Sequence, residues 1–149
     1  MNTKTIVCNL LLGTVLIASA AGCASNHNTP ATVVSDSALM QGAWTGHDAG
    51  AGSDAEASHF IIAGNNFEFR GTDANEWYKG TFTLKEDTKP KQILITVKEC
   101  SASQYVGQAS HGIYKFEGAK LIITAREPGT PDMPADFDEA CARRIDFTK

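Results

Sequence analysis

The chain has 149 residues, with 17 acidic and 13 basic side chains and a formal net charge of −4. Its length suits one hydrophobic core and is too short for two ordinary domains. A mildly acidic chain without a basic cluster is a poor match for nucleic acid or for an anionic lipid surface. We therefore expect one folded domain and no nucleic-acid partner.

The first 22 residues resemble the signal peptide of a bacterial lipoprotein. A basic start at Lys4 precedes an apolar stretch at 6–17, which is shorter than the roughly 20 residues that span a bilayer. Small residues follow and lead to Cys23, as a cleavage site requires. In such lipoproteins this Cys becomes the lipidated first residue. We expect residues 1–22 to be removed and Cys23 to carry a firm lipid anchor.

The residue after this Cys indicates a location. By resemblance to the sorting rule of Gram-negative lipoproteins, Ala24 in place of Asp favours the outer membrane, facing the periplasm. An alternative stays open, namely a plain secretory signal cut after Ala20, which would leave Cys23 as a free thiol. Both interpretations place the protein outside the cytoplasm, and only the first ties it to a membrane.

The remaining cysteines favour a structural disulfide. Cys8 belongs to the leader, so Cys100 and Cys141 are left, and two thiols in an oxidising compartment usually pair. Such a bond would contribute roughly 4 kcal/mol in the chain-entropy model. The two residues form no CxxC motif, which argues against a redox or metal-binding pair.

Residues 23–37 are small and polar, which predicts a flexible tether between the anchor and the domain. At the end of this segment, Asp36 or Ser37 could cap one helical turn that runs through Leu39 and Met40. We expect the folded domain to cover residues 38–149.

The domain reads as short strands separated by turn residues. Residues 77–84 alternate with period 2, with Tyr78 and Phe82 on one face and Lys79 on the other. Eight strands are predicted, at 43–46, 58–63, 67–70, 77–84, 92–98, 112–116, 121–125 and 143–147. Each strand lies near a hairpin partner. We therefore predict an all-β, antiparallel up-and-down barrel, which leaves no sheet edge exposed.

Two resemblances support this barrel. The segment 42–44 (Gly-Ala-Trp) resembles the G-x-W signature that opens the lipocalins. In that family the Trp plugs the closed end of the barrel, and an Arg from near the last strand covers it. This implies that Trp44 is the plug and that either Arg143 or Arg144 covers it.

Five segments of 38–149 carry a second and closer resemblance. The matching segments are 39–44 (Leu-Met-Gln-Gly-Ala-Trp), 78–84 (Tyr-Lys-Gly-Thr-Phe-Thr-Leu), 89–95 (Lys-Pro-Lys-Gln-Ile-Leu-Ile), 112–118 (Gly-Ile-Tyr-Lys-Phe-Glu-Gly) and 121–123 (Leu-Ile-Ile). In order and spacing these segments resemble a small bacterial lipocalin-like domain known mainly from planctomycetes, a family without an assigned activity. The resemblance strengthens the fold prediction and implies no catalytic residue.

Aromatic side chains are expected to supply much of the core or to line a ligand site. The interior of an eight-stranded barrel is just wide enough to be filled by side chains or to hold one small ligand. The strands are short, which favours a mostly filled interior with a shallow mouth. The residues expected to line the core or a ligand are Trp44, Phe67, Phe69, Tyr78 and Phe82.

No motif points to catalysis, a metal or a cofactor. Ser110 and His111 are adjacent, but a catalytic triad needs the hydroxyl against the imidazole with an acid behind it. The spacing of potential zinc ligands in 47–59 fits no known pattern. We expect no enzyme activity, no catalytic residue, no metal and no cofactor.

Two functions remain. One is an envelope lipoprotein that binds a small apolar molecule at the mouth of its barrel. The alternative is a protein-binding or structural envelope factor, similar in architecture to small inhibitor barrels, with a filled core. In that case the loop 46–58 or the loop 127–140 would dock the partner, whereas in a ligand-binding barrel the first of these loops could cover the mouth.

Overall fold

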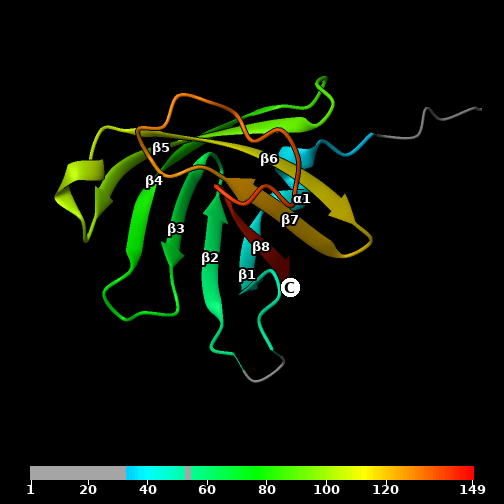
Figure 1. Cartoon of the computed structure of the whole chain (residues 1–149). Coiled ribbons are helices and arrows are strands. Elements are labelled where there is room, and N and C mark those ends of the chain that lie inside the picture. The colour runs from blue at the N-terminus through cyan, green and yellow to red at the C-terminus, as the bar shows by residue number, and fades with distance from the viewer. Residues whose placement is uncertain (1–32, 53–54) are drawn as a thin grey trace, which may run out of the picture. The chain divides into compact units, whose positions relative to one another are not determined.

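A computed structural model describes residues 33–52 and 55–149 (Figure 1). The predicted signal peptide, Cys23 and the tether up to residue 32 lie outside the described residues. Within the described part of the chain, no helix is long and apolar enough to cross a membrane.

The predicted all-antiparallel eight-stranded barrel is confirmed. Each strand is hydrogen-bonded to the next in the chain, and β8 pairs with β1 to close the barrel. The strands are β1 (Gly42–Asp48), β2 (Ser58–Ala63), β3 (Asn66–Arg70), β4 (Trp77–Lys85), β5 (Lys91–Cys100), β6 (Ala109–Glu117), β7 (Lys120–Ala125) and β8 (Arg143–Thr148). A short helix, α1 (Asp36–Met40), precedes the barrel, and a 3-10 turn, η1 (Ser103–Tyr105), links β5 to β6.

The two ends of the barrel differ. We call one the closed end: there α1 meets the start of β1, and three tight connections join β2 to β3, β4 to β5 and β6 to β7. The other end carries the connections β1–β2, β3–β4, β5–β6 and β7–β8, and we call it the mouth. These longer mouth connections include η1 and the long segment before β8 (Figure 1).

Helix α1 belongs to the folded unit rather than to a tether. The compact unit begins at Val33. Ser35 caps the helix, because its hydroxyl accepts a hydrogen bond from the Ala38 amide at 3.3 Å. The predicted caps, Asp36 and Ser37, therefore lie inside the helix. A carboxylate at the first helical position suits the positive end of the helix dipole, and this one also contacts the barrel.

Asp36 fastens α1 to the barrel. Its Oδ2 accepts a hydrogen bond from the Tyr114 hydroxyl at 2.9 Å and lies 2.5 Å from the Lys91 ammonium. Asp36 and Tyr114 are both buried. Burial, together with the hydrogen bond to Asp36, raises the pKa of Tyr114 well above its ordinary value.

The G-x-W segment completes the closed end. Gly42 has a φ of 108°, a backbone conformation that favours glycine, and it lets the chain turn from α1 into β1. Trp44 is 4% exposed, and its indole N–H donates to the Met40 carbonyl at 2.6 Å. The ring is thus a packing plug whose one polar group is satisfied.

The expected arginine cover over Trp44 is wrong. Lys149 takes that place, with its ammonium 4.5 Å from the ring centroid of Trp44 and 3.1 Å from the Leu39 carbonyl. Arg143 and Arg144 are at the start of β8, and that strand begins at the mouth. They pair with acidic side chains instead. The cation comes from the end of the strand because only that end reaches the plug.

Candidate ligand pocket at the barrel mouth

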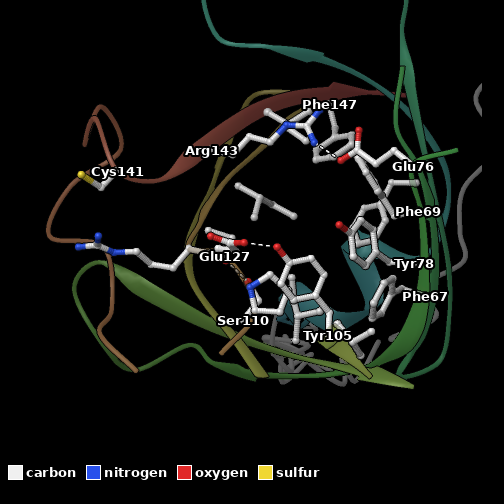
Figure 2. A pocket seen from close by; sticks show the side chains of 18 residues that line it. Phe67, Phe69, Glu76, Tyr78, Tyr105, Ser110, Glu127, Cys141, Arg143 and Phe147 are labelled. Atoms are coloured by element: carbon white, nitrogen blue, oxygen red, sulfur yellow. Dashed lines mark hydrogen bonds and ion pairs between the residues drawn. The ribbon is translucent and has the colours of Figure 1, made fainter. Parts of the chain in front are cut away.

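A cavity of about 380 Å³ occupies the half of the barrel nearest the mouth (Figure 2). Residues from the mouth connections line its entrance, including Glu76, Tyr105 and Pro128. Six aromatic side chains supply much of its wall: Phe60, Phe67, Phe69, Tyr78, Tyr105 and Phe147. Half of the other lining residues are also apolar (Ile95, Val97, Ile123, Ala125, Pro128 and Ile145), so two thirds of the lining residues are aromatic or aliphatic and the cavity is mainly apolar.

The cavity exists because the two sides of the barrel carry side chains of different size. The aromatic residues come mainly from β2, β3 and β4, whereas β6 and β7 present Ser110 and Ala125 to the same space. Small side chains opposite large rings leave volume unfilled. The expectation of a mostly filled interior therefore holds for the closed end and is wrong for the mouth half.

The five residues predicted to line the core or a ligand divide between these halves. Phe67, Phe69 and Tyr78 line the cavity. Trp44 and Phe82 are buried in the core and are not among the lining residues. The inward-facing residues of β4 show the division, because Tyr78 faces the cavity and Phe82, nearer the closed end, fills the core.

The aromatic side chains form a continuous wall. The ring of Phe60 lies 5.3 Å from that of Phe147, 5.8 Å from Phe67 and 6.3 Å from Phe69, measured between centroids. The series continues from Phe69 to Tyr78 at 6.3 Å. A last pair joins Tyr78 to Tyr105 at 6.4 Å. Rings at these distances attract one another and hold each other's orientation, so the wall is formed before a ligand arrives.

A glycine on β4 leaves the space that one of these rings occupies. Gly80 is buried on β4 where the pairing with β5 shifts register. A Cβ added at Gly80 would lie 2.0 Å from the Thr96 carbonyl oxygen and 2.9 Å from the ring of Phe67. Only glycine therefore lets β4 approach β5 this closely while Phe67 faces the cavity.

Arg143 joins two mouth segments across one side of the entrance. Its guanidinium grips Asp48 at the end of β1 with bonds of 2.7 and 3.0 Å, and its third nitrogen pairs with Glu76 (Figure 2). The group also lies 5.7 Å from the ring of Phe69. Hydrogen bonding to Asp48 raises the pKa of Arg143. The two carboxylates thus use all three nitrogens of this guanidinium.

The opposite side of the entrance is built from η1 and the segment before β8. The Tyr105 hydroxyl donates to the Glu127 carboxylate, and the dashed line in Figure 2 marks this contact. Ser110 donates to the Arg126 carbonyl at 2.5 Å, and the Arg126 guanidinium pairs with Glu139. Arg126 has one buried nitrogen, Nε, without a partner in the described structure.

Arg144 lies outside the cavity wall. Its Nε donates to Asp146 at 2.9 Å, and another of its nitrogens lies 2.6 Å from Asp138. It therefore fixes the long segment before β8 to that strand and does not line the cavity.

The predicted disulfide is not formed in this structure. Cys100 and Cys141 are both free thiols, and Cys100 Sγ donates to the Ala102 carbonyl at 2.9 Å. Cys141 is exposed on the segment before β8 and lines the cavity. Cys100 ends β5, and β5 and β8 are not neighbours in the barrel, so no strand pairing brings the two together.

The other sequence features are dispersed. Ser110 points into the cavity and bonds to backbone, while His111 follows it on β6, where successive side chains face opposite sides. In the described ranges, no three His, Cys, Asp or Glu side chains are grouped to hold a metal ion. None of the described residues of the loop 46–58 lines the cavity, so this loop provides no cover for it in this structure.

No family model, curated protein or solved structure matches the chain. A function therefore has to be inferred from the fold and from the chemistry of the cavity.

Proposed function

We propose that this protein is an envelope-anchored lipoprotein whose barrel binds a small apolar molecule without chemical conversion. The observation that carries the proposal is the apolar cavity of about 380 Å³ with its aromatic wall. Ligand pockets typically have volumes of roughly 300–1,000 Å³ and combine an apolar lining with a few polar groups at fixed places. The cavity has both properties. A filled interior, expected for the alternative of a protein-binding barrel, is absent from its mouth half.

The size of the cavity bounds the affinity. A ligand that loses about 300 Å² of apolar surface gains about 7 kcal/mol from burial. Loss of its translational freedom offsets part of this gain. We therefore expect dissociation constants in the micromolar range or weaker for simple apolar probes.

Native mass spectrometry of the protein made with its own leader tests the proposal. We expect an extra mass that disappears after solvent extraction and is absent from unfolded protein. The extracted protein should then bind N-phenyl-1-naphthylamine, a neutral apolar fluorophore, with increased emission. A bare polypeptide mass, together with no response from the fluorophore, would overturn the proposal.

Filling the cavity should weaken binding. Ile95 lines the cavity from β5, whereas its neighbour Leu94 is exposed on the outer face of the same strand. We expect Ile95→Trp to weaken binding of the fluorophore at least about tenfold, because the indole occupies ligand volume. Leu94→Trp adds the same side chain outside and should leave affinity unchanged. Equal affinities for the two variants, both folded by circular dichroism, would place the ligand elsewhere.

Anchoring is tested separately through Cys23. We expect Cys23→Ala to move the protein from the membrane fraction to the soluble envelope fraction and to abolish incorporation of labelled palmitate, because the acyl chains supply the attachment. Cys141→Ala changes an exposed thiol and should leave the location unchanged. Wild-type protein in the soluble fraction would instead support the plain secretory signal.

A further inference from the structure

The cations at the cavity entrance are already neutralised. Arg126 and Arg143 are the only cationic side chains among the described residues that line the cavity. Arg143 holds Asp48 and Glu76, and Arg126 holds Glu139. Arg126 Nε has no partner, but this nitrogen is buried, so an anionic headgroup at the entrance would have to displace one of these carboxylates to reach an exposed part of a guanidinium.

Glu127, by contrast, is not paired with a cation in the described structure. It lines the cavity entrance, and its contact is with the neutral hydroxyl of Tyr105 (Figure 2). Its negative charge is therefore left without a cationic partner at the entrance to an apolar cavity.

The balance of charge at the entrance is negative. Two carboxylates, Glu76 and Glu127, line the cavity, and two more, Asp48 and Glu139, pair with the two lining guanidiniums from outside the lining. The carboxylates also affect the pKa values of two tyrosines at the entrance. Burial raises the pKa of Tyr78, and Glu76 and then Cys100 raise it further; Arg143 lowers it, and Glu127 adds the smallest increase. The hydrogen bond to Glu127 raises the pKa of Tyr105.

Aromatic faces next to this carboxylate add a second attraction for positive charge. Tyr105 contacts Glu127, and Tyr78 follows it in the aromatic wall, with its hydroxyl directed toward the cavity in Figure 2. A cation within about 6 Å of such a ring centroid is stabilised by the negative face of the ring. A carboxylate placed beside Glu127 and these faces would be repelled.

Given the proposed function, on which this step rests, we infer that the cavity selects a lipophilic amine over a fatty acid. The apolar tail would enter the cavity, and the ammonium group would stay at the entrance between Glu127 and the ring faces of Tyr78 and Tyr105. Glu127 is exposed, so water and salt weaken the attraction, and we expect a moderate rather than a large selectivity.

Three ligands with the same tail test this inference at pH 7.4. Decylamine, decanol and decanoate are titrated, below their aggregation concentrations, against N-phenyl-1-naphthylamine bound to the full-length protein. We expect decylamine to bind about tenfold more tightly than decanoate, with decanol between them. The preference for the amine should shrink as the salt concentration rises.

Glu127→Gln identifies the responsible group. We expect this variant to bind decylamine about threefold more weakly than the wild type, to bind decanoate more tightly and to bind decanol with unchanged affinity. Glu117→Gln removes the same charge at the closed end and should change none of the three affinities. Tyr105→Phe keeps the carboxylate and releases it from its hydrogen bond, so decylamine should bind at least as well as to the wild type.

The outcomes separate the two proposals. If none of the three ligands displaces the fluorophore, the proposed function itself fails. If decanol and decanoate bind as tightly as decylamine, the cavity binds apolar tails and the inference about the headgroup is overturned. That inference also fails if Glu127→Gln and Glu117→Gln affect decylamine equally.

Discussion

Replacing Trp44 with Ala should lower the free energy of unfolding by about 3–5 kcal/mol, the range found for large aromatic side chains removed from a core. The side chain is 4% exposed and lies in the main hydrophobic core, and its indole N–H donates a hydrogen bond to the Met40 carbonyl. Its loss opens a cavity at the closed end and leaves that carbonyl without its partner. Chemical denaturation followed by circular dichroism measures the change.

The other tryptophan provides the control. Trp77 is half-buried at the start of β4 and does not line the cavity, so Trp77→Ala should destabilise the barrel much less. Trp44→Phe keeps a ring in the core but loses the N–H, which should cost about 1–2 kcal/mol. Equal losses for Trp44→Ala and Trp77→Ala would show that Trp44 is not the plug of the barrel.

Removing the Asp36 carboxylate should have the second largest effect. We expect Asp36→Ala to lower the free energy of unfolding by about 2–3 kcal/mol, because it leaves the buried Tyr114 hydroxyl without its acceptor. The Lys91 side chain is 41% exposed, so the ion pair contributes little to this loss. Asp132→Ala removes an exposed carboxylate and should change stability little.

A double-mutant cycle with Tyr114→Phe isolates the contact. We expect a coupling energy of about 1–2 kcal/mol between Asp36 and Tyr114. Additive losses would mean that the hydrogen bond contributes nothing to holding α1 on the barrel.

The same contact predicts a pH dependence. The folded protein raises the pKa of Tyr114 above its ordinary value near 10. Above about pH 10, the unfolded chain therefore loses a proton that the folded chain keeps, and stability falls as the pH rises. The decline should be shallower in Tyr114→Phe, and denaturation series between pH 7 and 11 compare the two proteins.

The strands can be predicted because their signals are local. Alternation and turn residues place every strand to within three residues at each end; for example, residues 58–63 are β2. The plug role of Trp44 also follows from a short motif and is matched by its burial. The predicted cap of α1, Asp36 or Ser37, is one or two residues too late, since Ser35, Asp36 and Ser37 are all good caps and only the contact of Asp36 with Tyr114 selects among them.

The site depends on which side chains face each other across the barrel, and a single sequence does not contain this directly. Ser110 and Ala125 are visible as small residues, but their position facing the aromatic wall requires the closed barrel. The resemblance to lipocalins predicts that Arg143 or Arg144 lies over the Trp44 ring, whereas the ammonium of Lys149 lies there in the structure. The prediction that Cys100 pairs with Cys141 rests on the number of cysteines, which carries no geometry.

The pairing of β8 with β1 also has a consequence for how the protein is made. Seven of the strand pairings join neighbours in the chain, whereas this one joins residues as distant as Thr45 and Thr148. Synthesis delivers β1 first and β8 last, so until β8 arrives both β1 and β7 have an open edge that can pair with other chains. Once the seam closes, a cation secures each end of it: Arg143 binds Asp48, and Lys149 binds the Leu39 carbonyl. The period before closure is therefore when the chain most needs protection from aggregation.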